Sequence, residues 1–417
     1  MTGRYCWRTS LQAGVLNVTA PLHIEPARLT LGSLFKKHGY QTAAIGKWHL
    51  GYGSTDPVDF AKPLTPGPHE LGFDYHFAVP SNHGDQTHAY VENDRLLGRK
   101  PNMPFQLNGK KLPEALAQPR VDDRVNITLT EKAVGFLEKQ SAAQPFFLYF
   151  TPVAVHNPIT PNKRFRGKSK AGIYGDYICE LDYTVEQVLA VLDRKGLAGN
   201  TLVIFSSDNG AVVTKGAPTA ESTLTLEDDT NDAVTAHYRQ GKAEAEQAGL
   251  KSVGDLRGRK HSIYEGGFRV PYLVRWPGQV PAGTVSDEVV QLTDTLASCA
   301  AILGEKLAAN AAEDSYDVRP AWLGAKLTRP IREATVVHSA EGVFAIRQGP
   351  WKMIEARDFK DSKKKKNSWH AEAFSQLYNL TSDPSEAKNV WDQHPDVVAR
   401  LQGLLTRYRR DGRSRPV

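Results

Sequence analysis

Cysteine is scarce in this chain of 417 residues, which contains only Cys6, Cys179 and Cys299. Three widely separated cysteines form neither the paired spacing of a zinc site nor the even-numbered framework of a disulfide-stapled domain. We interpret them as small buried side chains or free thiols. The chemistry of the protein must therefore rest on other residue types.

Long apolar runs and internal repeats are also lacking. No stretch reaches the roughly 18 apolar residues of a transmembrane helix, and no apolar segment follows the basic residues near Met1, as it would in a signal peptide. Either the protein is cytoplasmic or its true start is missing. Hydrophobic residues make up 40% and charged residues 24% of the chain, typical of a globular protein with a large domain and a smaller one.

The formal net charge of +6 is a mild positive excess that favours anionic ligands. Four consecutive lysines at 363–366 form the tightest basic run, which we interpret as a solvated loop rather than a binding patch. No nucleic-acid-binding motif accompanies this basicity, so no nucleic-acid partner is expected.

Apolar runs alternate with helical patterns, which predicts an α/β fold with a mostly parallel sheet flanked by helices, followed by a smaller C-terminal α+β domain. The predicted strands are residues 42–45, 146–150, 201–205 and 270–276. The predicted helices are residues 31–38, 130–140 and 181–192, with short strands at 342–354 and a closing helix at 395–408. We expect residues 1–325 to form the larger domain, with a polar surface excursion at 216–256, and residues 333–417 the smaller one.

Polar side chains follow three of these strands. Lys47 and His49 come after the first, His156 after the second, and Asp208 and Asn209 after the third. In open α/β sheets, ligands bind at the carboxyl ends of the strands. These side chains are therefore expected to converge on one crevice.

Each of these residues, taken alone, also has a simpler interpretation. Asp208 and Asn209 offer hard oxygen donors suited to Ca²⁺ or Mg²⁺, but an Asp-Asn-Gly sequence is more often a turn whose glycine takes a positive φ. A lone histidine is commonly structural, and Lys47 can be a surface lysine. Composition and periodicity do not decide between these interpretations.

Five segments in a fixed order resemble the sulfatase family, which belongs to the alkaline-phosphatase superfamily. They are residues 39–49 (GYQTAAIGKWH), 156–158 (HNP), 206–210 (SSDNG), 264–271 (YEGGFRVP) with Lys260 upstream, and 377–386 (LYNLTSDPSE). The likeness covers nearly the whole chain. It implies an alkaline-phosphatase-like fold and the hydrolysis of sulfate esters.

The resemblance also implies residue roles. Asp208 and Asn209 would bind Ca²⁺, or else Mg²⁺, while Lys47 and Lys260 would hold the sulfate oxygens and stabilise charge on the leaving group. Pre-placed cations and a metal ion would stabilise the negative charge of a sulfuryl group in transfer.

Two histidines complete this implied set. His49 would assist the nucleophile, and His156 would contact the sulfate or protonate the leaving oxygen. Such proton transfer suits a group whose pKa lies near the working pH.

The beginning of the chain departs from the family pattern. Thr2, Gly3 and Arg4 resemble the tail of a signature whose first residue, a cysteine or serine, is oxidised to formylglycine by a maturation enzyme. We therefore expect the nucleophile, an Asp-Asp pair and the first strand to lie upstream of Met1, which would leave the printed chain inactive. Cys6 lies after this tail and lacks the neighbouring proline, so it is not expected to replace the nucleophile.

A second departure lies at Asn82, where many family members have a serine that contacts the sulfate or metal region. Asn82 is a candidate substrate-binding residue, Ser81 and His83 are alternatives, and a plain loop is equally consistent with the sequence. The resemblance further implies a periplasmic, secreted or lysosomal location.

We expect a sulfuric ester hydrolase that acts on small-molecule or carbohydrate sulfate esters. A phosphoesterase or phosphonate hydrolase of the same superfamily is one alternative, although the Gly-Lys-Trp-His and Glu-Gly-Gly segments favour a sulfatase. A non-catalytic binder of sulfated polyanions is the other, in keeping with the positive charge and the missing nucleophile.

Overall fold

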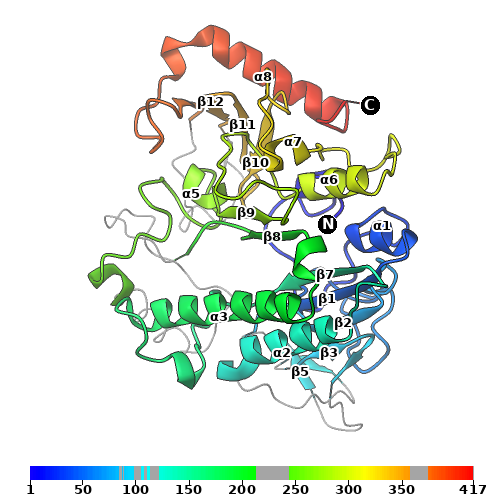
Figure 1. The fold of residues 1–417 in the computed structure, drawn as a ribbon. Coiled ribbons are helices and arrows are strands. Elements are labelled where there is room, and N and C mark those ends of the chain that lie inside the picture. Colours follow the sequence, from blue (N-terminus) through cyan, green and yellow to red (C-terminus); the bar gives the residue numbers. More distant parts are fainter. Residues whose placement is uncertain are drawn as a thin grey trace. The chain divides into compact units, whose positions relative to one another are not determined.

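The computed structural model describes residues 1–83, 87, 89–97, 105–107, 110–112, 122–212, 244–356 and 374–416. These residues form two compact units (Figure 1). Unit 1 contains the described parts of Met1–Thr2, Leu16–Thr201 and Asp228–Ala248, and unit 2 those of Gly3–Val15, Leu202–Glu227 and Gly249–Val417. The four lysines at 363–366 and most of the predicted excursion at 216–256 lie outside the described residues.

A five-stranded mixed sheet forms the centre of unit 1. Its strands, in spatial order, are β4 (Arg95–Leu96), β3 (Val91–Glu92), β2 (Tyr75–Val79), β1 (Gln41–Lys47) and β7 (Phe146–Thr151). Strand β1 runs parallel to both β2 and β7, whereas the short β3 and β4 pair antiparallel. Because β1 and β7 are parallel, their carboxyl ends lie at the same edge of the sheet.

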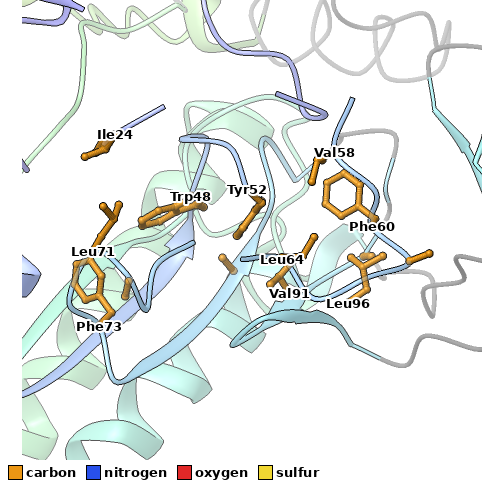
Figure 2. Packing of buried hydrophobic residues seen from close by; sticks show 14 residues of the cluster. Ile24, Trp48, Tyr52, Val58, Phe60, Leu64, Leu71, Phe73, Val91 and Leu96 are labelled. Atoms are coloured by element: carbon orange, nitrogen blue, oxygen red, sulfur yellow. The ribbon is translucent and has the colours of Figure 1, made fainter. Parts of the chain in front are cut away.

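Alternate side chains of β1 enter two different cores, as the two-residue period of a strand requires. Ala43 and Ile45 pack against Ala133 of helix α2 (Val125–Glu138). Ala44, on the opposite face, joins a second cluster that includes Trp48 and Tyr52. Figure 2 shows the buried members of this second cluster, which is built mostly from loop segments.

The remaining elements of unit 1 flank this sheet or extend from it. They are α1 (Leu31–Lys37), β5 (Phe105–Leu107), β6 (Lys110–Leu112), η2 (Asp122–Arg124), η3 (Lys163–Phe165), α3 (Gly172–Arg194) and η4 (Ala198–Asn200). Helix α1 packs on the sheet through Phe35, whose ring stacks on that of Phe147 in β7 with 4.4 Å between centroids. Helix α1 begins at a capping box formed by Thr30 and Ser33.

Unit 2 contains a four-stranded antiparallel sheet. Its strands, in spatial order, are β10 (Thr335–His338), β11 (Phe344–Gln348), β12 (Trp351–Ile354) and β13 (Gln376–Asn379). Helix α8 (Pro395–Arg410) covers one face, where its leucines pack against Ile346 and Met353. The opposite face receives Ile263 and Tyr264. The segment that carries Lys260 is thus anchored directly on this sheet.

The other elements of unit 2 include a separate two-stranded antiparallel sheet made of β8 (Val203–Ser206) and β9 (Tyr272–Arg275). The rest are η1 (Cys6–Arg8), α5 (Glu265–Phe268), α6 (Asp294–Ile302), α7 (Arg319–Trp322) and η6 (Trp391–Gln393). No helix in the described ranges is both long enough and apolar enough to cross a membrane.

The predicted α/β fold with a smaller C-terminal sheet is found, with one difference in strand pairing. The strands predicted at 201–205 and 270–276 pair antiparallel with each other as β8 and β9, rather than joining the parallel strands. The apolar runs mark both segments as strands but do not reveal which strand is the neighbour of which. The domain division near residues 325–333 stays a prediction.

Candidate functional site

The Gly-Lys-Trp-His segment forms a sharp corner at the end of β1. Gly46 has φ +123°, and a Cβ at this position would lie 2.0 Å from the carbonyl oxygen of Thr151, so only glycine fits. Lys47 follows at the strand end, and its own carbonyl accepts a hydrogen bond from the Thr151 hydroxyl at 2.7 Å. Trp48 is buried and anchors the corner in the second core cluster of unit 1.

His49 is held in a backbone conformation that is uncommon for a residue with a side chain, with φ +52°. Its N–H donates to the carbonyl of Pro80, and its ring Nε2 lies 2.8 Å from the carbonyl oxygen of Leu16. A carbonyl can only accept, so Nε2 carries the hydrogen, and Nδ1 of the neutral ring is the acceptor. The hydrogen bond to Leu16 therefore fixes the orientation of the imidazole.

His156 lies in the loop that follows β7. Its Nδ1 is 2.7 Å from the carbonyl oxygen of Asn157, so by the same reasoning Nδ1 carries the hydrogen and Nε2 is the acceptor of the neutral ring. Strand β7 ends at Thr151, which pairs with Gly46. The structure therefore brings the strand ends that precede His156 and Lys47 side by side.

The Asn82 loop contacts the His156 loop through one hydrogen bond. The Nε2 atom of the buried His83 lies 3.1 Å from the hydroxyl oxygen of Thr160. Asn82 itself has a buried Oδ1 with no hydrogen-bond partner among the described residues. A buried amide oxygen costs free energy unless a donor or a ligand satisfies it. The role of Asn82 as a contact residue stays a prediction.

Asp208 and Asn209 form a turn directly after β8. The Asp208 side chain is exposed. The Asn209 Nδ2 donates to the carbonyl of Gly210, and the Ser207 hydroxyl donates to the carbonyl of Asn209. The bond made by Asn209 uses its amide nitrogen and not Oδ1. The turn thus presents one carboxylate and one carboxamide oxygen.

The Glu-Gly-Gly segment holds this turn through backbone contacts. The Gly210 N–H donates to the Gly267 carbonyl at 2.9 Å, and the Lys260 N–H donates to the Ala211 carbonyl at 3.1 Å. A Cβ on Gly210 would lie 1.8 Å from the carbonyl oxygen of Gly266. The glycines are therefore required for close backbone approach, and this approach places Lys260 next to the Asp208–Asn209 turn.

The donor types of this turn fit a hard divalent cation, but the turn alone does not complete a site. Ca²⁺ takes roughly six to eight oxygen ligands, more than the side chains of Asp208 and Asn209 could supply. Within the described residues, no three His, Cys, Asp or Glu side chains are grouped closely enough to hold a metal. A metal site at this turn therefore stays a prediction.

The predicted site residues therefore fall into two sets. Lys47, His49, Asn82 and His156 lie in unit 1, while Asp208, Asn209 and Lys260 lie in unit 2. Within each unit, hydrogen bonds link the segments that carry these residues. The convergence of both sets on one crevice stays a prediction.

Sequence reasoning missed the residues that support the second set. Glu265 and Glu386 both form ion pairs with Lys352, a lysine that is 1% exposed. The two glutamates lay within the family-like segments, which was a usable signal. No sequence signal marked Lys352, because a single lysine in a short strand is normally expected to face solvent.

Two family models match this chain. One, described as Sulfatase, matches residues 4–305, and the other, described as N-sulphoglucosamine sulphohydrolase, C-terminal, matches residues 259–411. An N-acetylgalactosamine-6-O-sulfatase of Bacteroides thetaiotaomicron is 33% identical, over 97% of this chain and 81% of that relative. The human N-acetylgalactosamine-6-sulfatase is 31% identical, over 72% of this chain and 50% of its own length. The chain thus spans about half the length of the mammalian relatives it matches.

Solved structures with the same fold include one from work on Bacteroides thetaiotaomicron and one from Pseudoalteromonas. A protein from a study of glycosaminoglycan metabolism by Bacteroides thetaiotaomicron superposes with a TM-score of 0.80 at 32% identity, covering 97% of this chain and 87% of that one. The PsFucS1 sulfatase from Pseudoalteromonas superposes with a TM-score of 0.69 at 22% identity, covering 98% and 78%. The second likeness concerns the fold alone.

Proposed function

This chain belongs to the sulfatase family of sulfuric ester hydrolases, and on that premise we propose that it hydrolyses the sulfate esters of a carbohydrate. The observation that carries the proposal is that the segment with Lys260 and the Asp208–Asn209 turn lie side by side in unit 2. Two backbone hydrogen bonds hold the segment that carries Lys260 beside the turn that carries the two hard oxygen donors. This combination suits an anionic group whose charge must be stabilised during transfer.

The lysines are proposed to stabilise the sulfuryl group. Its negative charge spreads over the oxygens as the ester bond to the carbohydrate oxygen breaks, and fixed cations stabilise that charge without reorganising at the moment of reaction. Lys47 and Lys260 are each proposed to bind sulfate oxygens, and Asn82 is proposed to add a polar contact through its buried amide.

The histidines are proposed to transfer protons. The hydrogen bond from Nδ1 of His156 to a carbonyl fixes the ring orientation, so that Nε2 is the atom which exchanges a proton with the leaving oxygen. His49, oriented by its hydrogen bond to Leu16, is proposed to assist the nucleophile. In the family the nucleophile is a formylglycine made by a maturation enzyme, and we propose that this protein uses it as well.

Asp208 and Asn209 are proposed to bind Ca²⁺, together with ligands from elsewhere in the protein. When bound, such a cation would polarise the sulfate oxygens as a Lewis acid. The carboxylate and carboxamide oxygens suit Ca²⁺ or Mg²⁺ far better than softer metals.

The proposed substrate class follows from the relatives with at least 30% identity. Several of them are named as sulfatases of N-acetylgalactosamine 6-sulfate. A 6-sulfated N-acetylgalactosamine unit is therefore the first carbohydrate to test. The proposed location is periplasmic, secreted or lysosomal, where sulfated polysaccharides are degraded.

A comparison of aryl sulfate with aryl phosphate tests the proposed reaction. The protein, produced together with a formylglycine-generating enzyme, is expected to release the phenol from the sulfate with a kcat/KM at least about 100-fold higher than from the phosphate. A preference for the phosphate would identify a phosphoesterase. Binding of both esters with turnover of neither would favour the polyanion-binding alternative.

Replacing Asp208 by alanine is expected to abolish stabilisation by Ca²⁺. A ligand that binds only the folded state at 100 times its Kd adds about 2.7 kcal/mol to the free energy of unfolding. The wild type should therefore gain thermal stability on Ca²⁺ addition, and the variant should gain little, as measured by the Tm with and without the ion. Asp392→Ala, which removes an exposed aspartate of unit 2, is the matched control. An equal Ca²⁺ response of Asp208→Ala and wild type would exclude Asp208 as a ligand.

A further inference from the structure

Lys352 lies at the centre of a buried cluster of charged groups in unit 2. Its Nζ is 3.0 Å from Oε1 of Glu265 and 2.8 Å from Oε1 of Glu386. The side chains of Lys352 and Glu386 are 1% and 0% exposed, and that of Glu265 is 11% exposed. Arg347, which is more exposed, approaches Glu265 at 3.6 Å. One buried ammonium therefore faces two carboxylates, and Arg347 adds a second, more exposed cation beside Glu265.

Two acidic groups compete for this single ammonium. Burial alone would raise the pKa of both carboxyl groups. For Glu265 burial is the largest influence, but the combined attraction of Lys352, Arg347 and Arg269 outweighs it and the pKa is lowered; for Glu386 burial prevails and the pKa is raised. Removing the ammonium would leave two carboxylates in a site with little access to water, a costly arrangement that the surrounding backbone would move to avoid.

The cluster connects two elements that are far apart in the sequence. Lys352 lies in β12, and Glu386 comes from the segment after β13, where its Oε2 accepts a hydrogen bond from the backbone N–H of Glu265 at 2.6 Å. Glu265 is the first residue of helix α5. Side chain and backbone of Glu265 are thus both fixed by this cluster, which attaches the start of α5 to the C-terminal sheet.

Helix α5 is hydrogen-bonded to the loop that contains Lys260. The N–H of Gly266 donates to the carbonyl of Arg257, which closes the loop that contains Lys260. The carbonyl of Gly267 accepts the N–H of Gly210, which follows the Asp208–Asn209 turn. A displacement of Glu265 would therefore move both ends of the loop and its contact with the turn.

A second contact reaches the same loop from Glu386. Arg257 donates to the backbone carbonyl of Glu386 at 2.8 Å and lies over the ring of Tyr264, 3.8 Å from its centroid. Glu386 therefore contacts the Lys260 loop at its first residue and, through Glu265, at the helix that ends it. The loop is fixed at two points by the same C-terminal residue.

We propose that Lys352 is a positioning residue for Lys260, acting through the Lys352–Glu265–Glu386 ion cluster that fixes the loop of residues 257–269. The proposal rests on the proposed role of Lys260 in sulfate binding. It also assigns a purpose to the Asp-Pro-x-Glu segment near the C-terminus, because Glu386 supplies the second carboxylate of the cluster. Lys352 itself touches neither substrate nor metal in this account.

The test is a double-mutant cycle on the affinity for inorganic sulfate, measured by calorimetry on the folded full-length protein. Lys352→Met is expected to weaken sulfate binding about tenfold. In the Lys260→Ala background the same substitution is expected to have almost no further effect, since the side chain that it positions is gone. Amide exchange in residues 257–269 should also become faster in Lys352→Met.

Arg332→Met is the matched control, because it removes another buried cation of unit 2. Its partner Asp294 lies in α6, outside residues 257–269, and the side chains of this pair are 2% and 0% exposed. This variant is expected to lose thermal stability without a change in sulfate affinity. Lys388→Met, an exposed lysine two residues after Glu386, is expected to change neither quantity.

The outcomes separate this inference from the proposed function. If Lys260→Ala leaves sulfate affinity unchanged, the proposed role of Lys260 in sulfate binding is wrong. If Lys260→Ala weakens binding while Lys352→Met does not, or if the two effects simply add, positioning by Lys352 is overturned. Should Lys352→Met not fold, the pair Lys352→Met/Glu386→Gln, which removes one charge of each sign, carries the same test with the same expected loss of affinity.

Discussion

Replacing Lys260 by alanine is expected to lower kcat for an aryl sulfate about 10²- to 10³-fold, the usual cost of removing one preorganised group that stabilises developing charge. The same result is expected for Lys47→Ala. Each lysine is placed by backbone contacts, Lys47 by the Gly46–Thr151 corner and Lys260 by its bond to Ala211. Because the charge develops mainly in the transition state, kcat should fall more than KM rises.

Steady-state kinetics of both variants, with circular dichroism to check folding, makes this measurement. Lys251→Ala is the matched control. Lys251 is an exposed lysine of unit 2 that forms an ion pair with the exposed Asp255. It should leave kcat unchanged. A Lys260→Ala or Lys47→Ala variant that is folded and retains wild-type kcat would remove that lysine from the proposed mechanism.

Gly210→Ala is expected to lower the free energy of unfolding by about 3 kcal/mol and to weaken the binding of both Ca²⁺ and sulfate. The new Cβ would lie 1.8 Å from the carbonyl oxygen of Gly266, so the Asp208–Asn209 turn and the Lys260 loop would have to separate. This steric effect acts on backbone that cannot rotate away, unlike a contact with a flexible side chain.

Urea unfolding of Gly210→Ala measures the loss of stability, with Gly403→Ala as the matched control. Gly403 is an exposed residue of helix α8, and a Cβ there meets nothing within 4 Å. Alanine at this position should be neutral or stabilising by up to about 1 kcal/mol, because it favours the helix. Gly210→Ala with wild-type stability and wild-type ligand affinities would contradict the close docking of the turn on the Glu-Gly-Gly segment.

The elements with strong local signals could be predicted from the sequence. The closing helix was predicted from Pro395 onward, and α8 begins there with proline in its first turn, a position where its missing N–H costs nothing. The start of α2 was placed at residue 130, whereas the helix begins at Val125. Arg124 precedes it without a side-chain cap, so no capping signal marked the true start.

The sequence predicts the segments of the candidate site that depend on neighbouring residues, but not the contacts between segments that are distant in the chain. The Asp-Asn-Gly sequence after β8 predicts a turn with a positive φ at Gly210, but Gly210 does not take that φ, and glycine is required there by its close approach to the carbonyl oxygen of Gly266. The Lys352 cluster is different, because its partners lie 87 residues away at Glu265 and 34 residues away at Glu386 (352 − 265 and 386 − 352). A buried ion pair of this kind depends on which strand faces which loop, and that information is absent from any local pattern.

Release of inorganic sulfate from 6-sulfated N-acetylgalactosamine is the measurement that tests the proposed function most directly. It uses the protein produced together with a formylglycine-generating enzyme and compares the wild type with Lys260→Ala. Steady sulfate release is expected from the wild type, with a loss of about 10²-fold or more in the variant. Salt-sensitive binding of the sulfated sugar by both proteins, with sulfate released by neither, would contradict it and identify a protein that binds sulfated carbohydrates without cleaving them.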